Sequence, residues 1–64
     1  MIGKVIRFEG SFGFIRAENG QSLFVFYKDI VAMDGFRTLN EGDRVEFDVQ
    51  ENPRGLRAVE VRVI

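Results

Sequence analysis

Histidine and cysteine are both absent from this 64-residue chain, and their absence excludes several kinds of site. Without cysteine, the chain can form neither a disulfide nor a thiolate metal site. Without histidine, it lacks the commonest metal ligand and the commonest general base. The sequence also shows no nucleophile–base pair, no phosphate-cradling loop and no paired carboxylates in an apolar pocket. We therefore expect a protein that is not an enzyme and that uses no metal and no cofactor.

Long hydrophobic runs and a strong charge of one sign are missing as well. No apolar stretch approaches the roughly 18 residues of a membrane span, and Met1–Lys4 lacks the apolar stretch of a secretory signal. We therefore expect a cytoplasmic protein without membrane contacts. Nine basic and ten acidic residues give a net charge of −1, so overall charge cannot attract the chain to nucleic acid.

Phenylalanine, by contrast, is abundant, and four of the seven lie in two short alternating runs, Ser11–Ile15 and Leu23–Tyr27. Side chains two positions apart in a strand share a face. One face then carries four rings, those of Phe12, Phe14, Phe24 and Phe26. The other face carries the small or aliphatic residues Gly13, Ile15, Leu23 and Val25. Large exposed apolar patches usually mark binding sites. Flat aromatic rings suit flat ligands, above all unpaired nucleobases.

The turn between the two runs tests whether the rings share one surface. The Asn-Gly pair at 19–20 is a strong hairpin signal. A two-residue turn there would place Phe14 opposite Val25 and mix the two faces, whereas a three-residue loop over 18–20 places Phe14 opposite Phe24. The second register is the consistent one. It predicts a type I turn whose glycine is left-handed and lies in a bulge.

The remaining sequence reads as short strands with turn signals between them. We predict strands at about Ile2–Phe8, Phe12–Ala17, Gln21–Tyr27, Val45–Gln50 and Ala58–Val63. Lys28–Met33 is short enough for one helical turn, Asp34-Gly35 is predicted to form a turn, and Thr38–Gly42 reads as loop. A small open sheet would leave bare edges, so we expect one all-β domain over residues 1–64, a five-stranded antiparallel barrel.

The alternation of the strands also predicts the core. Val59, Val61 and Val63 should point inward, with Ala58, Glu60 and Arg62 outward. The full predicted core is Val5, Ile15, Leu23, Val25, Ile30, Val45, Phe47, Val49, Val59 and Val61. Gly13 is expected where the barrel wall bends or neighbouring backbone comes close.

The order of these motifs resembles the bacterial cold-shock protein family. That family opens with G-K-V-K-W-F-N and, after a short loop, K-G-F-G-F-I; here Gly3–Glu9 and Phe12–Ile15 match. Its D-V-F-V-H-F motif corresponds to Ser22–Tyr27. Three later motifs, G-F-x-T-L, E-G-x-x-V-x-F and N-R-G-x-x-A-x-x-V, correspond to Gly35–Leu39, Glu41–Phe47 and Pro53–Val61. The aromatic motifs are also similar to RNA-recognition motifs, but those domains are longer and carry two helices for which this chain lacks room.

The resemblance covers nearly the whole chain in order. It implies an oligonucleotide-binding (OB) barrel whose partner is single-stranded DNA or RNA, bound with low sequence specificity as by an RNA chaperone. Carried over by position, the family's contacts match Lys4, Phe8, Phe12, Phe14, Phe24, Phe36 and Arg54. Tyr27 replaces a Phe and keeps a ring that can stack, and Phe26 stands where the family has His. For Phe36, binding and packing at the barrel end remain equally open.

Four departures from the family pattern reduce the expected contacts with nucleic acid. Arg7 occupies the position of the family's binding Trp, and we include it in the site because a guanidinium can stack on a base or pair with phosphate. Ile6 replaces a Lys, and the Lys before the first F-G-F is absent because the loop is shorter. Ser22 replaces an Asp. The departures imply weaker binding, a shorter binding site or a different base preference.

The four rings also have an interpretation without nucleic acid. They could form a homodimer interface, and the chain could be a protein-interaction barrel that has lost nucleic-acid binding. We favour base stacking because basic residues accompany the rings, namely Lys4, Arg7, Arg16 and Arg54. We also expect a monomer rather than a dimer.

Overall fold

The computed structural model describes residues 1–32 and 37–64, so Phe36 and the turn predicted at Asp34-Gly35 lie outside the described residues. The strands are β1 (Ile2–Glu9), β2 (Phe12–Ala17), β3 (Ser22–Phe26), β4 (Arg44–Asn52) and β5 (Gly55–Val63). The last two extend further into the loop at 52–55 than predicted. The predicted helical turn is a single 3-10 turn, η1 (Tyr27–Asp29), which starts one residue earlier than expected and is shorter.

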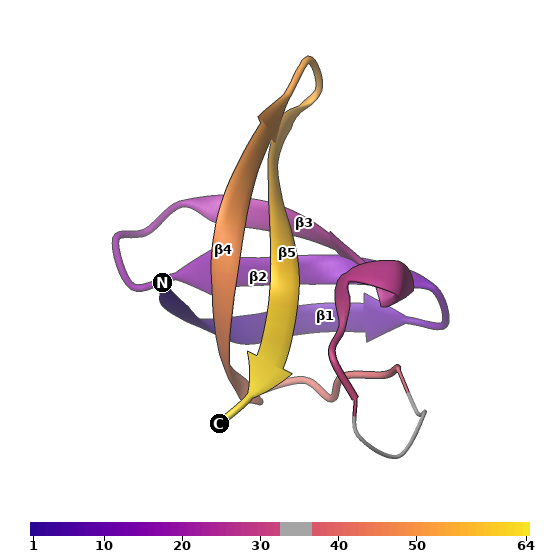
Figure 1. The fold of residues 1–64 in the computed structure, drawn as a ribbon. Coiled ribbons are helices and arrows are strands. Elements are labelled where there is room, and N and C mark those ends of the chain that lie inside the picture. Colours follow the sequence, from indigo (N-terminus) through magenta and orange to yellow (C-terminus); the bar gives the residue numbers. More distant parts are fainter. Residues whose placement is uncertain (33–36) are drawn as a thin grey trace.

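The strands close into a barrel, as predicted, and their order around it is β1-β2-β3-β5-β4. Figure 1 shows the hairpin of β4 and β5 crossing over the sheet of β1, β2 and β3. Backbone pairing of β1 with β4 completes the closure. One ladder differs from the antiparallel prediction, because β3 and β5 pair in parallel through Phe24–Arg57 and Val25–Ala58.

The β2–β3 hairpin has the predicted register. Phe14 lies opposite Phe24 and Phe12 opposite Phe26, so the four rings share the outer face. Gly20 has φ 91°, the left-handed conformation that glycine adopts without a steric penalty. Its N–H donates a hydrogen bond of 2.9 Å to the Ala17 carbonyl, which closes the three-residue loop.

β1 meets β2 at very close range around Gly13. A methyl group at Gly13 would lie 2.2 Å from the Arg7 carbonyl oxygen, which confirms the expected close approach of backbone. The register of the two strands shifts between Val5 and Arg7, leaving Ile6 as an extra residue. The shift places Arg7 opposite Phe14, on the face that carries the rings.

The alternation predicted for β5 is confirmed for Val61, Glu60 and Arg62 and is wrong for Ala58 and Val63. Ala58 and Val61 are fully buried, whereas Val63 is 55% exposed and Val59 only half-buried. The register between β4 and β5 shifts after Glu46, and Glu60 has φ 53°. A bulge at Glu60 therefore inserts one residue and changes which residues of β5 face the barrel.

The barrel interior is otherwise close to the predicted core. The buried apolar residues are Val5, Ile15, Ala17, Leu23, Val25, Ile30, Leu39, Val45, Phe47, Ala58 and Val61. Val49 was wrongly placed in the core and is 38% exposed. The burial of β4 stops after Phe47, because the hairpin projects beyond the barrel there (Figure 1).

Candidate nucleic-acid interface

Four phenylalanine rings lie together on the outer face of β2 and β3. We call this surface the phenylalanine face: Phe12, Phe14, Phe24 and Phe26. The three outer rings are between 39% and 41% exposed. Phe24 lies at the centre, its ring centroid 5.8 Å from Phe12, 5.5 Å from Phe14 and 4.5 Å from Phe26. The first pair is stacked and the other two are edge-to-face, the arrangements that aromatic pairs prefer.

The rings are exposed because the opposite face of the hairpin already fills the barrel. Ile15, Leu23 and Val25 are at most 1% exposed, and each alternates with a phenylalanine. Because side chains on one strand alternate between faces, burying the rings would expose these three aliphatic residues. The burial of these three aliphatic residues in the core thus determines that the rings are exposed.

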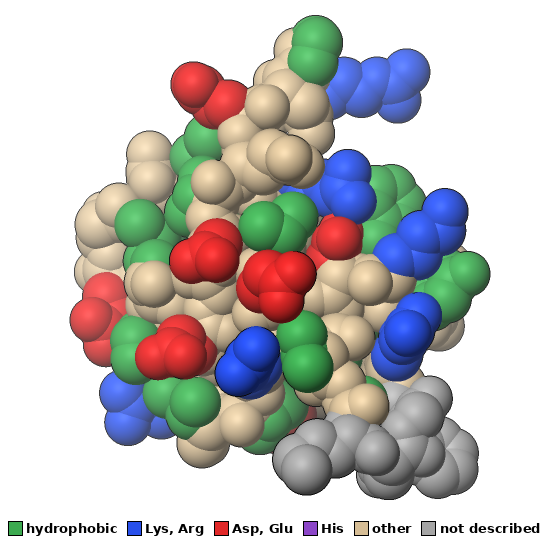
Figure 2. Space-filling view, viewed as in Figure 1, with side chains coloured by type: hydrophobic (Ala, Val, Ile, Leu, Met, Phe, Trp, Pro, Cys, Tyr) green, Lys and Arg blue, Asp and Glu red, His purple; other side chains and the backbone are tan. Residues whose placement is uncertain are grey.

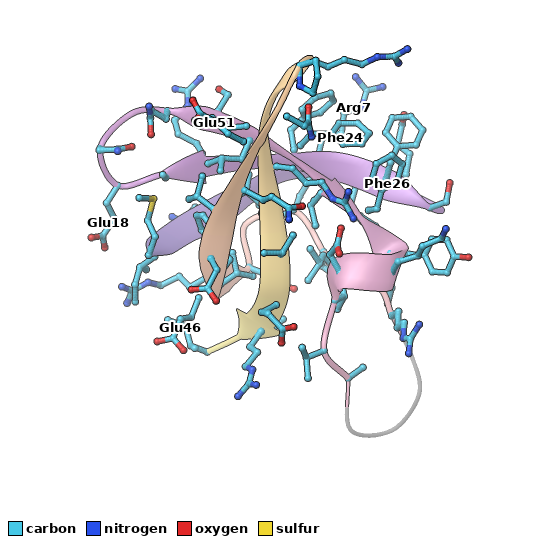
Figure 3. All side chains as sticks on the ribbon, turned by 45° about the horizontal axis from the view of Figure 1, so that its top comes forward. Arg7, Glu18, Phe24, Phe26, Glu46 and Glu51 are labelled. Atoms are coloured by element: carbon cyan, nitrogen blue, oxygen red, sulfur yellow. The ribbon has the colours of Figure 1, made fainter. Side chains whose placement is uncertain are left out.

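β1 borders the phenylalanine face with charged residues. Arg7 lies opposite Phe14, and Glu9 lies opposite Phe12. One Arg7 guanidinium nitrogen donates a hydrogen bond of 2.8 Å to the Glu9 carboxylate, an ion pair in which both side chains are well exposed. Figure 3 shows Arg7 on the same side of the molecule as Phe24 and Phe26, and away from Glu18 and Glu46. The position of the family's Trp therefore carries a cation at the edge of the rings.

Lys4 lies on the same outer face, further along the strands. It pairs with Arg16 of β2, two residues beyond the Arg7–Phe14 pair on that strand. Both side chains are exposed. The structure thus brings Lys4 to the margin of the phenylalanine face and not against its rings.

A groove runs between the phenylalanine face and the turn that joins β4 to β5. It has a volume of about 430 Å³, and its walls include Phe14, Phe24 and Phe26 on one side and Arg54 and Arg57 on the other. The Arg54 N–H donates a 3.0 Å hydrogen bond to the Asn52 side chain, which orders the turn. The predicted Arg54 thus faces the rings across an apolar gap.

Arg57 is a candidate residue that the sequence analysis missed. Its guanidinium carbon lies 5.5 Å from the centre of the Phe26 ring, within the range of a cation–π contact. The Asp29 carboxylate accepts a 2.8 Å hydrogen bond from its Nε. The contact depends on parallel pairing of β5 with β3, and no local pattern around residue 57 indicates it.

The other predicted site residues have different positions. Tyr27 is 40% exposed and begins η1, directly after Phe26. Phe8 is half-buried, lies opposite Gly13 and packs against the core, so the structure does not bring it onto the phenylalanine face. Its part in binding stays a prediction, as does that of Phe36.

Acidic residues occupy a different side of the barrel. Glu46, Asp48 and Glu60 are exposed on β4 and β5. Figure 2 shows acidic side chains gathered over these two strands and most basic side chains at the right-hand side of the molecule. Although the net charge is near zero, the charges are therefore partly separated. An acidic area covers the β4–β5 hairpin, whereas Arg7, Arg54 and Arg57 lie near the rings, two of them paired with Glu9 and Asp29.

This arrangement of rings and cations on a closed five-stranded barrel agrees with comparisons to known proteins. The 'Cold-shock' DNA-binding domain family matches residues 1–64. The chain belongs to the cold-shock domain family. Proteins of this family bind nucleic acid and are not enzymes, which confirms the expected class.

Individual relatives support the assignment over most of the chain. "Cold shock protein CspC" of Bacillus subtilis is 46% identical over 54 residues, which cover 84% of this chain and 80% of the relative. The "Major cold shock protein" of Streptococcus pyogenes serotype M18 is 49% identical over 53 residues, 83% of this chain and 78% of the relative. The "Cold shock-like protein" of Thermotoga maritima is 42% identical over 66 residues, 100% of this chain and 98% of the relative.

A solved structure supports the fold. The barrel superposes on the structure described as "drosophila Unr CSD456" with a TM-score of 0.78 and 23% identity, covering 98% of this chain and 26% of that chain. The expected OB-type barrel is thereby confirmed. None of the described residues forms a helix long and apolar enough to cross a membrane.

Proposed function

We propose that residues 1–64 act as one domain that binds single-stranded RNA or DNA with low sequence specificity, by stacking bases on the phenylalanine face. The exposed cluster of rings carries this proposal. Every nucleobase has a flat face that can stack on a phenyl ring, so such a surface binds with little regard to sequence. The base edges, which carry sequence information, meet few hydrogen-bonding side chains among these rings.

The surrounding cations support the same interpretation. Arg7 lies beside Phe14, and Arg54 faces the rings across the groove. A guanidinium can pair with phosphate or stack on a base. Bases would rest on the rings while these side chains hold the backbone at both edges of the surface.

Binding of this kind implies an RNA-chaperone-like action. A base in a hairpin stem is already stacked and paired, so only transiently opened strands can reach the rings. A protein that binds the open form alone shifts the opening equilibrium by mass action. No nucleotide hydrolysis is required.

The direct test is a titration of the protein with a fluorescently labelled oligothymidine, with light scattering on the same samples. We expect saturable binding of one oligomer per monomer, and weaker competition by duplex DNA of equal length. Absence of binding together with a dimer in solution would contradict the proposal, and would support self-association through the phenylalanine face.

A further inference from the structure

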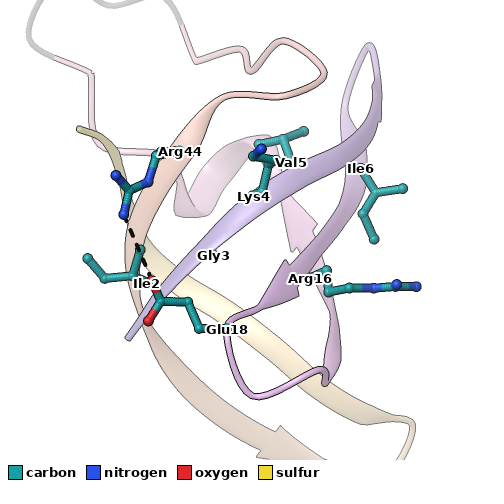
Figure 4. A pocket seen from close by; sticks show the side chains of 8 residues that line it. All are labelled: Ile2, Gly3, Lys4, Val5, Ile6, Arg16, Glu18 and Arg44. Atoms are coloured by element: carbon teal, nitrogen blue, oxygen red, sulfur yellow. Dashed lines mark ion pairs between the residues drawn. The ribbon is translucent and has the colours of Figure 1, made fainter.

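A second concave surface lies next to the phenylalanine face. It has a volume of about 480 Å³ and lies between the start of β1, the end of β2 and the start of β4. We call it the basic groove: its walls carry Lys4, Ile6, Arg16, Glu18 and Arg44. Figure 4 shows Arg16 and Ile6 at one end and Glu18 meeting Arg44 at the other. None of the described aromatic residues lines it.

The groove carries an excess of positive charge. Among the described residues that line it, three cationic side chains face one carboxylate, that of Glu18. One Arg44 nitrogen lies 3.8 Å from a Glu18 oxygen, and both side chains are more than 60% exposed, so solvent weakens their attraction. Lys4 and Arg16 form no ion pair with any described residue. Their charges are therefore available to an anionic ligand.

The groove continues directly from the phenylalanine face. Arg7 and Phe14 are opposite one another, and Lys4 and Arg16 form the pair two residues further along β2. Two residues of a strand span roughly 7 Å, a distance comparable with one nucleotide of an extended strand. Arg44 lies opposite Lys4 on the next strand. A row of cations thus starts about one nucleotide beyond the last ring.

We propose that the basic groove binds the phosphates of the same single strand where it continues beyond the phenylalanine face. This inference rests on the proposed function and deepens it. None of its described lining residues carries an aromatic ring, so the groove adds contacts to phosphate and no stacking. Its contribution is therefore independent of sequence, sensitive to salt and present only for strands long enough to reach it.

The test compares a short and a longer oligothymidine, of about 5 and about 12 nucleotides, within the range of site sizes of OB barrels. The variant carries Arg16→Gln and Arg44→Gln. We expect the ratio of the longer oligomer's affinity to the shorter one's to fall several-fold. The salt slope for the longer oligomer should fall by about 0.7 for each phosphate that the variant no longer neutralises. Arg62→Gln removes one positive charge, against two in the variant, from an exposed residue on β5 and should leave the ratio unchanged.

Glu18→Gln should change the affinity for the longer oligomer in the opposite direction. It removes the one carboxylate among the described residues that line the groove and frees Arg44, so the longer oligomer should bind more tightly while the shorter one is unaffected. An increase for both oligomers alike would reflect net charge and would overturn the groove assignment.

The outcomes separate the groove from the phenylalanine face. If the wild-type protein binds both oligomers and the affinity ratio is the same in all variants, the groove proposal is wrong and the stacking function stands. If the wild-type protein binds neither oligomer, both proposals are wrong. Circular dichroism melting of each variant identifies any weakening of binding that comes from unfolding.

Discussion

Phe24 is the residue that connects the exposed rings, since it contacts Phe12, Phe14 and Phe26 at once. It is also less exposed than its three neighbours. Replacing Phe24 would therefore disturb both the binding surface and the packing of the hairpin. Phe14 is 41% exposed and lies at the edge of the cluster. Replacing it should therefore weaken binding with little effect on stability.

Phe14→Ala should weaken the binding of single-stranded oligonucleotides by about 1–3 kcal/mol, the usual worth of one stacked base. Its midpoint of thermal unfolding should hardly change, because much of the ring is in contact with solvent. Fluorescence titration and differential scanning calorimetry measure the two effects. Phe47→Ala is the matched control, because Phe47 is 1% exposed and its replacement should cost about 3–5 kcal/mol of stability. A similar drop in stability for Phe14→Ala would place that ring in the core.

Arg7 is the second residue whose role can be isolated. Arg7→Trp should tighten single-strand binding by about 1 kcal/mol, because a stacking ring replaces a charge that Glu9 already partly neutralises. Titration of one oligomer against both proteins measures the change. Arg7→Gln serves as the control, since it removes the charge without adding a ring. Affinity that is unchanged or weaker in Arg7→Trp would show that β1 contributes charge alone to the surface.

Among the elements, β2 depends most on close contact with its neighbour. A side chain at Gly13 would collide with the Arg7 carbonyl oxygen and with Phe8. Gly13→Ala should therefore lower the free energy of unfolding by about 1–3 kcal/mol, as overpacking does. Urea denaturation measures this change. Ser22→Ala, at an exposed position of β3, should change stability by less than about 0.5 kcal/mol, and an equally small effect of Gly13→Ala would contradict the close approach.

Glu60, at the bulge in β5, has a left-handed backbone conformation that favours glycine. The left-handed region costs a residue with a side chain about 1–2 kcal/mol, and glycine loses part of that gain through its greater flexibility when unfolded. Glu60→Gly should therefore raise the free energy of unfolding by about 0.5–1 kcal/mol, as measured by urea denaturation. Glu46→Gly, on the neighbouring strand with an ordinary backbone, should lower it. Destabilisation by both substitutions to the same extent would argue against the bulge.

For the whole molecule, the absence of histidine and the small net charge determine how binding responds to solution conditions. No side chain in the chain has an ordinary pKa between pH 6 and 8, so affinity should be nearly constant over that range. The log–log dependence of affinity on salt should have a slope of magnitude roughly 1–3, at about 0.7 per phosphate neutralised on a single strand. Titrations from low to moderate salt at three pH values measure both. A steep slope, or binding that vanishes at physiological salt, would show that charge and not ring stacking drives association.

Local periodicity determined much of this protein. Two alternating runs joined by a loop at 18–20 allow only one register that keeps Phe14 with Phe24 and Ile15 with Leu23, because a slip by one residue moves every side chain to the other face. The closed barrel followed from five short strands that would otherwise leave bare edges. The sequence alone therefore predicted the exposed rings, the aliphatic residues on the opposite face of the hairpin, and the closed barrel.

Only the tertiary structure decided the features that depend on contacts between distant strands. The bulges at Ile6 and Glu60 arise where strands of a small barrel must bend, and they set which residues of β1 and β5 face outward. Arg57 reaches Phe26 through a parallel pairing that local sequence does not encode. The basic groove likewise brings Arg44 beside Lys4 and Arg16, residues far apart in the chain. Alternation within a strand determines which residues share a face of that strand. The closure of the barrel determines which strands become neighbours, and so which residues from different strands lie together.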